Sequence, residues 1–281
     1  MAGHVYMKFK KNIKWINIFI LPSLVGIILF YVFPFLKILG NAFIRNSDEV
    51  FVGFSNIRVV MQNKAFMLAS GNTGMYMLVS IPLLMSVSLL FAKLLWKVTG
   101  WIKNIKFLYV MPLAIPAASL SIYWQFFFHQ SGILNFLIKD DIEWLHSGYG
   151  FWVFVFIFIW KNFGYTVILW LGGISKIPVA ILEAARTDGA SEWMIFVRII
   201  LPNLKQTMLI VYILSLINSF KIFREAYALA GDYPHESMYL LQHLFNNWFR
   251  DFELDKMAGA TILYLSALLL ILFPMQRFSN H

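Results

Sequence analysis

The chain has 281 residues, of which 60% are hydrophobic and only 13% are charged, and it contains no cysteine. Soluble domains carry about a quarter charged residues. This composition therefore excludes an ordinary water-soluble domain and favours a membrane protein with several spans. The lack of cysteine excludes disulfides, thiolate metal sites and cysteine nucleophiles. We attribute the net charge of +9 to basic residues that flank membrane spans, not to nucleic-acid binding.

Six long apolar segments predict six transmembrane helices, because each is close to the ~20 residues that cross a bilayer. They cover residues 16–39, 73–95, 105–128, 150–172, 207–227 and 257–273. The first follows a lysine-rich start but is too long for a signal-peptide core and lacks a small-residue cleavage site, so we interpret it as a retained span. The predicted fold class is an all-α membrane protein with one membrane domain over residues 1–281.

The lysine distribution predicts that both ends of the chain are cytoplasmic. Segment 1–15 holds four lysines and no acid, and lysines without acids also surround segment 96–104. The opposite loop 129–149 holds one lysine and three acids. Basic residues concentrate in cytoplasmic loops, so the pattern gives N-in and C-in with six spans.

Two segments are expected on the outer side. In segment 40–72, Ser55 is suited to cap a short helix, with Phe54 stapled against Val59. In segment 228–256, the sequence Gly-Asp-Tyr-Pro at 231–234 should end the helix of the fifth span.

The predicted inner loop 173–206 has the pattern of two helices joined by a tight turn. Pro178 suits the first turn of a helix that runs to about Thr187, and Asp188-Gly189 suits its end. Ser191 can cap a second helix, which Pro202 should end. One apolar stripe is expected on that second helix, formed by Trp193, Phe196, Val197 and Ile200.

The same loop resembles the signature of permeases of ATP-binding-cassette (ABC) importers. That signature is Glu-Ala-Ala, three residues, Gly, nine residues, Ile, one residue, Leu-Pro. The matching positions are Glu183, Ala184, Ala185, Gly189, Ile199, Leu201 and Pro202. The sequence from Asp188 to Ser191, together with segments 51–56 and 223–227, is similar to the maltose-type carbohydrate permeases in particular. The turn at 231–234 and Lys161 depart from that group's pattern.

The resemblance implies a type I ABC importer permease with a cytoplasmic coupling helix pair that docks on an ATPase. It implies four kinds of partner: a second permease in a heterodimer, two cytoplasmic ATPase subunits, an extracellular or periplasmic substrate-binding protein, and the lipid bilayer of a prokaryotic cell membrane. The chain has no Gly-x-x-x-x-Gly-Lys-Ser/Thr loop, so we expect no cofactor in it, with ATP and magnesium held by the ATPase subunits.

Polar residues inside the spans are the candidates for the substrate path. They form three sets: Lys161, Asn162 and Tyr165; Asn218, Ser219 and Lys221; and, more weakly, Tyr123, Trp124 and Gln125. Amides and aromatic rings suit sugars. Other roles also fit, because polar residues often bridge helices, Lys161 could pair with a partner subunit, and Lys221 could extend to the membrane surface.

Three functions follow. The first is a carbohydrate importer permease, and the second is the same machine importing a polyamine, phosphate or another small polar solute. The third is a secondary transporter or channel working alone, which would need acidic residues in the spans, and we expect the spans to lack them. The six histidines have no metal-site spacing, and each is expected at the surface.

Overall fold

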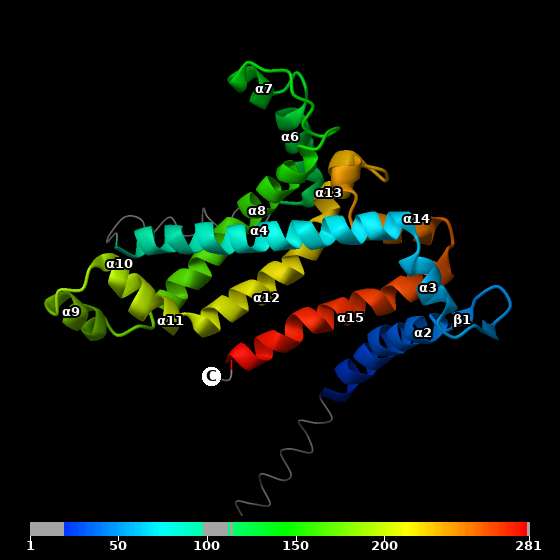
Figure 1. Ribbon diagram of the computed structural model, residues 1–281, viewed down its shortest axis with the longest axis horizontal. Coiled ribbons are helices and arrows are strands. Elements are labelled where there is room, and N and C mark those ends of the chain that lie inside the picture. Colours follow the sequence, from blue (N-terminus) through cyan, green and yellow to red (C-terminus); the bar gives the residue numbers. More distant parts are fainter. Residues whose placement is uncertain (1–19, 98–111, 113–114, 280–281) are drawn as a thin grey trace, which may run out of the picture. The chain divides into compact units, whose positions relative to one another are not determined.

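The computed structural model describes residues 20–97, 112 and 115–279, and this part of the chain is mostly helical (Figure 1). Five of its helices are long and apolar enough to cross a membrane: Ile20–Asn41, Lys64–Trp96, Gly150–Ile174, Lys205–Ala230 and Leu254–Ile271. They confirm five of the six predicted spans. The predicted third span, 105–128, lies partly outside the described residues, which include only its last helix, α6 (Ala117–Phe128). The N-in, C-in orientation stays a prediction.

The chain divides into two compact units, one of residues 1–63 and 248–269 and the other of residues 64–247 and 270–281. The first unit holds π-helix η1 (Ile28–Val32), α2 (Phe33–Asn41), the two-stranded hairpin β1–β2 (Ile44–Arg45 and Val50–Phe51), α3 (Ser55–Met61) and most of α15 (Leu254–Ser279). Ile44 pairs with Phe51 in the antiparallel register. The single membrane domain expected over residues 1–281 stays a prediction.

The predicted helix near Ser55 is present, but its start differs by one residue. Phe54 occupies the N-cap position, and Ser55 is the first residue of α3 without capping it. The ring of Phe54 packs edge-on against Phe43, with ring centroids 5.6 Å apart. This aromatic contact across the hairpin fixes the entry into α3 in place of the expected serine cap.

Close packing in the first unit joins α15 to α3. A Cβ atom added at Gly259 would lie 2.9 Å from the backbone oxygen of Asn56, so only glycine allows this approach. The Asn46 backbone N–H also donates to the carboxylate of Asp255 at 2.9 Å. The hairpin, α3 and α15 are thereby tied together.

Two of the prolines follow a π-helical turn. Pro34 lies at the start of α2 directly after η1, and Pro202 lies at the start of α11 (Leu201–Asn203) directly after π-helix η3 (Phe196–Ile200). A proline lacks the N–H of a regular helix and crowds the carbonyl four residues earlier. A wider π turn before it relieves that crowding. The helical segment ends at Asn203, one residue beyond the end predicted at Pro202.

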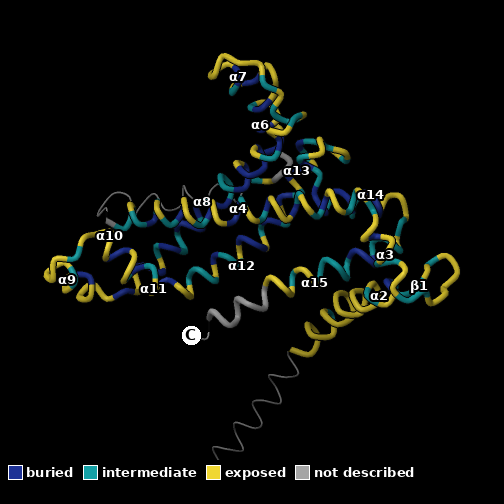
Figure 2. The backbone as a smooth tube through the Cα atoms, viewed as in Figure 1, coloured by how far each residue is buried: buried dark blue, intermediate teal, exposed yellow. Residues whose placement is uncertain are grey.

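The second unit is built around α8 (Gly150–Ile174), which packs against α4 (Lys64–Lys97) and α12 (Lys205–Lys221). Half of the most apolar stretch of α8 is buried, a larger share than for α4 or α12 (Figure 2). The helix α13 (Phe223–Ala230) continues from α12 and packs against α6. It ends at Gly231, whose φ of 74° confirms the turn predicted there.

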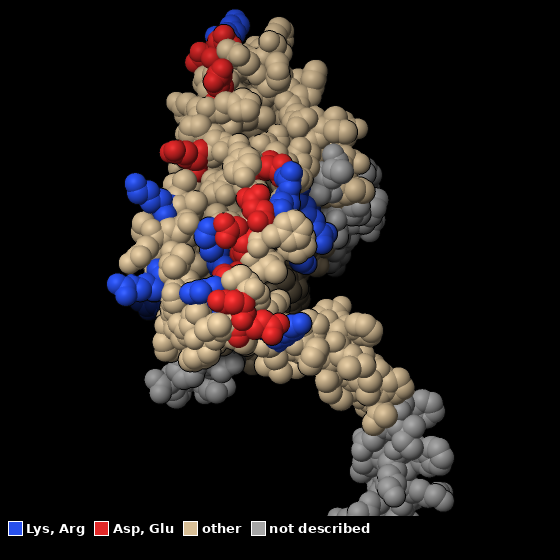
Figure 3. Space-filling model, turned by 90° about the vertical axis from the view of Figure 1, so that its right-hand side faces the viewer, with Lys and Arg blue, Asp and Glu red and all other residues tan. Residues whose placement is uncertain are grey.

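Shorter elements complete the second unit. They are α7 (Ile133–Ile138), α9 (Val179–Thr187), α10 (Glu192–Ile195), the 3₁₀ turn η4 (Glu236–Met238) and the start of α14 (Leu241–Arg250). In Figure 1, α9 to α11 lie at one end of α8 and α12, while α6, α7 and α13 lie at the other end. Figure 3 shows a face on which charged side chains form small groups within a mostly uncharged surface, as expected for a chain surrounded by lipid.

Candidate functional site

The first candidate site is the helix pair α9–α10, which confirms the helix-turn-helix predicted from the sequence. Pro178 precedes α9 as its N-cap residue, and Asp188 follows it as the C-cap. Ser191 caps α10, with its hydroxyl accepting a hydrogen bond from the Met194 backbone N–H at 3.2 Å. The ends of both helices are thus defined by neighbours in the sequence.

The turn between the helices is a closed Schellman motif. The backbone N–H of Gly189 donates to the carbonyl of Arg186 at 3.0 Å, and that of Ala190 donates to the carbonyl of Ala185 at 2.9 Å. Gly189 has a φ of +81°, a left-handed conformation that favours glycine. Across the turn, Nε of Arg186 lies 2.9 Å from the carboxylate of Glu192. These two hydrogen bonds and one ion pair hold the tip within one short segment.

The base of the pair is buried in an apolar cluster with the ends of α8 and α12. Leu182, Ile195, Phe196 and Ile200 are each at most 5% exposed, and they pack in one cluster with Trp170. The predicted stripe is only half right, because Trp193 is 65% and Val197 39% exposed. The π turn of η3 widens the helix and places residues five apart on one face, so Ile195 replaces Trp193 as the partner of Ile200.

The tip of the pair, by contrast, is open. Glu183, Ala184, Asp188 and Gly189 are exposed, and Ala185 is half-buried. The other signature positions belong to the base or near it: Ile199 and Leu201 are half-buried, and Pro202 is exposed. The signature therefore combines residues that present a small-residue surface with residues that hold it in place.

Lys93 of α4 fastens the second helix of the pair to the bundle. Its Nζ lies 4.1 Å from the ring centroid of Phe196 and 5.2 Å from that of Trp193. Such cation–π contacts contribute ~0.5–1 kcal/mol at exposed sites. The open tip is consequently mounted on a fixed base.

The second candidate site is a cavity of about 210 Å³ among α8, α12 and α13. It joins two of the polar sets that the sequence indicated. Its lining residues are Phe158, Lys161, Asn162, Asn218, Lys221, Ile222, Arg224 and Glu225. Six of these eight carry a polar or charged side chain, which is unusual for a hollow among membrane-spanning helices.

Lys161 forms an ion pair with Glu225, a residue that the sequence interpretation missed. Glu225 is 1% exposed and lies in the fifth predicted span, so the expectation that the spans hold no acid was wrong. The alternative that Lys161 pairs with a partner subunit is also corrected, since its counter-ion is in the same chain. The sequence did contain a signal for this pair, because a lysine and a glutamate in two different apolar segments are expected to pair with each other.

Four of the amide, phenol and hydroxyl candidates bridge or reinforce helices. The Asn218 amide donates to the Tyr165 hydroxyl at 2.9 Å and so joins α12 to α8. The Asn162 amide donates to the Phe158 carbonyl at 2.8 Å within α8. Ser219 is buried and donates to the Leu216 carbonyl, so it does not line the cavity.

The third predicted set lies elsewhere in the second unit. Trp124 is buried among aromatic rings, with the ring of Trp160 at 5.1 Å. Gln125 donates to the carbonyls of Ala228 and Leu229, which ties α6 to α13. Tyr123 is 71% exposed. None of these three residues lines the cavity.

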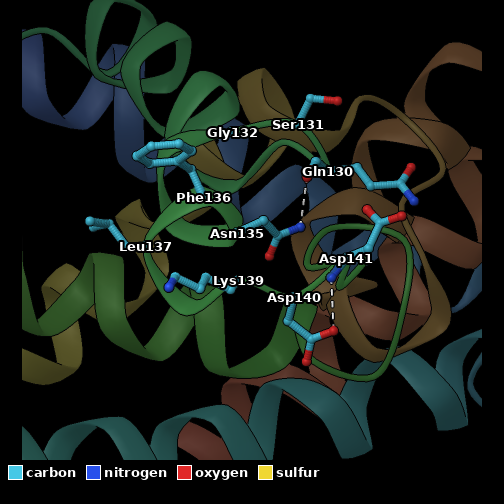
Figure 4. Close-up of a pocket in the computed structure, with 9 residues that line it drawn as sticks. All are labelled: Gln130, Ser131, Gly132, Asn135, Phe136, Leu137, Lys139, Asp140 and Asp141. Carbon is cyan, nitrogen blue, oxygen red and sulfur yellow. Dashed lines mark hydrogen bonds between the residues drawn. The ribbon is translucent and has the colours of Figure 1, made fainter.

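A larger hollow of about 960 Å³ lies beside α7 and is shown in Figure 4. Asn135 organises it by donating to the Gln130 carbonyl at 2.7 Å and accepting from the Trp144 indole at 2.6 Å. Asp140 and Asp141 lie on one side of it, and Phe136 and Leu137 on the other. No predicted site residue lines this hollow.

One histidine is not at the surface as expected. His243 of α14 is fully buried, and burial lowers its pKa to about 4, against a smaller raising effect of Asp232. The Leu240 backbone N–H donates to its Nδ1 at 3.2 Å, and its ring stacks on Tyr239. Within the described residues, no group of His, Asp and Glu could hold a metal ion.

Comparison with known proteins adds the family. Residues 13–281 match the family model described as "Binding-protein-dependent transport system inner membrane component". The chain is 26% identical over 93% of its length to the lactose transport system permease protein LacF of Rhizobium radiobacter, of which it covers 92%. It is 25% identical over 90% of its length to the osmoprotective compounds uptake permease protein GgtC of Synechocystis sp., of which it covers 94%.

Two solved structures share the fold. One is a bacterial ABC transporter that imports the acidic polysaccharide alginate, with a TM-score of 0.82, 20% identity, and coverage of 97% of this chain and 99% of that chain. The other is the alginate transporter in complex with its alginate pentasaccharide-bound periplasmic protein, with a TM-score of 0.80, 21% identity, and coverage of 95% and 94%. With nearly the whole chain matched by the family model, this protein belongs to the inner membrane components of binding-protein-dependent transport systems.

Proposed function

We propose that the chain is the permease subunit of an ATP-driven importer for a sugar or oligosaccharide. The observation that carries the proposal is the capped pair α9–α10, whose base is buried and whose tip leaves Glu183, Ala184 and Gly189 open to a partner. A plain connector between two spans needs no such construction. The pair would dock on a cytoplasmic ATPase subunit and transmit its closure to α8 and α12 as a rigid lever.

If this chain forms the membrane path and a separate subunit hydrolyses ATP, the other subunits of the importer follow. Two ATPase subunits would hold ATP and magnesium, so this chain would itself catalyse no reaction. A second permease would complete the solute path. A binding protein would deliver the cargo, as the family description and the complex of the alginate transporter with its periplasmic protein suggest. The name of LacF and the polar cavity favour a carbohydrate cargo.

The two amide groups of the cavity support import of a hydroxylated solute. Asn162 and Asn218 line it, and Tyr165 orients Asn218. A stand-alone secondary transporter would need a carboxylate free to exchange protons. Glu225 is paired with Lys161, so it does not favour that alternative. A polyamine is also disfavoured by three basic side chains in the lining.

A cross-linking experiment tests the docking. The chain has no cysteine, so Ala184→Cys introduces a single thiol at the exposed tip. We expect this thiol to cross-link to a cysteine placed in the docking cleft of the ATPase subunit, and ATP to change the yield. Phe136→Cys on α7, which is 83% exposed, is the matched control and should not react. Equal cross-linking of the two variants would contradict the proposal.

A second experiment tests the whole machine. Glu183→Lys should abolish ATP-dependent uptake, because it reverses the charge at the exposed tip. Undiminished uptake with unaffected ATPase association would show that the pair is not the coupling element.

A further inference from the structure

The cavity among α8, α12 and α13 has an excess of positive charge. It is lined by Lys161, Lys221 and Arg224 but by one carboxylate, that of Glu225, which gives a net charge of +2. Because Lys161 is paired with Glu225, the excess comes from the other two residues. Both are exposed and reach the cavity from the junction of α12 and α13.

Lys221 and Arg224 have no counter-ion among the residues that the structure describes. Within residues 20–97, 112 and 115–279, neither forms an ion pair or a side-chain hydrogen bond. Both lie in the apolar helix Lys205–Ala230. Unpaired cations in such a helix are costly, and they mark a solute path or a partner more often than a structural contact.

Glu225 supplies a second, independent observation. Its Oε1 is paired with Lys161, while its Oε2 is buried and has no hydrogen-bond partner in the described part of the chain. A buried carboxylate oxygen without a donor is unfavourable. Such an oxygen favours a hydrogen-bond donor, and Glu225 lines the same cavity as the two cations.

We propose that the transported solute is an anionic saccharide. Its carboxylate or phosphate would bind Lys221 and Arg224, and one of its hydroxyls would donate to Oε2 of Glu225. Arginine suits this role because its planar fork binds both oxygens of a carboxylate or phosphate. The proposal rests on the proposed function and narrows its substrate class to uronic-acid oligosaccharides or sugar phosphates.

Matched pairs of acidic and neutral sugars test the substrate class. The complete assembly with its binding protein is reconstituted in nanodiscs, and stimulation of ATP hydrolysis is measured. The probes are galacturonate, glucuronate and mannuronate trisaccharides, each with its methyl ester, and glucose 6-phosphate with glucose. We expect one acidic probe to stimulate ATP hydrolysis at least tenfold more than its neutral counterpart. Comparison of the uronates with glucose 6-phosphate shows whether the negative charge is a carboxylate or a phosphate.

The possible outcomes separate the two proposals. A neutral sugar that stimulates as well as its acidic counterpart would overturn the anionic cargo and leave carbohydrate import standing. If no sugar of either charge stimulates hydrolysis, carbohydrate import itself is wrong.

Charge variants test the site independently of the binding protein, which they leave unchanged. With Lys221→Gln and Arg224→Gln combined, uptake of the acidic probe should fall at least tenfold, and the preference for the acid over its methyl ester should be lost. The charge-conserving pair Lys221→Arg and Arg224→Lys should retain most of the uptake and shows that the site tolerates substitution. Arg58→Gln in α3, which removes one charge outside the cavity, is the control. Wild-type uptake of the acid by the neutralised variant would show that the two cations only reach the membrane surface or a neighbouring subunit.

Discussion

The helix pair α9–α10, which we propose as the coupling element and call the coupling pair, and the polar cavity differ in how they are held together. The turn and the caps of the pair are defined by contacts between residues at most six apart, such as Ser191 with Met194 and Arg186 with Glu192. The cavity is defined by contacts between distant residues, since Lys161 and Glu225 are 64 positions apart and Tyr165 and Asn218 are 53 apart. A surface that docks on a partner can be built locally, whereas a solute site among helices needs the assembled bundle.

The largest expected effect concerns the ion pair of the cavity. Glu225→Leu should lower the free energy of unfolding by about 3 kcal/mol, because it leaves Lys161 without its counter-ion in a largely buried place. Adding Lys161→Met should restore most of the loss, since no charge then remains unpaired. Thermal unfolding in detergent measures both variants.

The control is the surface pair Lys256–Glu253, whose carboxylate side chain is 44% exposed. Glu253→Leu should cost less than about 1 kcal/mol. An equally small effect of Glu225→Leu would mean that the cavity does not depend on this long-range pair.

The next largest loss of stability is expected at the contact of α8 with α12, between the coupling pair and the cavity. A Cβ atom at Gly173 would lie 2.5 Å from the hydroxyl oxygen of Thr207 and 2.7 Å from a methyl carbon of Leu204. Gly173→Ala should therefore destabilise the protein by about 1–3 kcal/mol, as overpacking does. Thermal unfolding is again the measurement.

Gly172→Ala provides a matched control one residue away, because a Cβ atom there would meet nothing within 4 Å. It should leave stability unchanged or raise it slightly. The two glycines are adjacent in the sequence, and only the packing distinguishes them. Equal effects would show that the helices do not approach closely at this point.

A smaller effect is expected at the turn of the coupling pair. Gly189→Val should cost about 1–2 kcal/mol, because a branched residue is strained at a φ of +81°. Gly189→Asn should cost much less, since asparagine tolerates this conformation. Cross-linking of Ala184→Cys to the ATPase subunit should fall with valine and persist with asparagine. A similar loss with both residues would place the cause in side-chain contacts, not in the backbone.

The smallest effect is a pH dependence from His243. Its folded-state pKa of about 4 lies below the ordinary value of 6.5, so between these values the unfolded chain binds the proton more readily than the folded chain. Stability should consequently fall as the pH falls, by about 1 kcal/mol from pH 7.5 to 5.5. Thermal unfolding at the two pH values should show this difference in the wild type and in the exposed-histidine control His146→Gln. His243→Phe should reduce the difference, and an unchanged difference would assign it to other groups.

Sequence patterns predicted most of the fold, including the helix pair α9–α10, whose docking role stays a proposal. Apolar length predicted five of the spans that the structure describes, and the spacing of Pro178, Gly189 and Ser191 predicted the coupling pair. They did not predict that Glu225 lines the cavity or that Ser219 does not, because both facts depend on how α8, α12 and α13 pack. The exposure of Trp193 was missed for a different reason, since a π turn changes the helical period on which the stripe was based.

The sequence by itself determined the membrane character of the chain, its long helices and the capped turn of the coupling pair. These depend on composition and on contacts between residues that are close in the sequence, so they do not require distant helices to pack together. Only the tertiary structure decided which polar groups meet in the cavity, that Lys161 already has a counter-ion and that His243 is buried. Such pairings form when distant helices pack together, because burial makes an unpaired charge costly and so selects its partner.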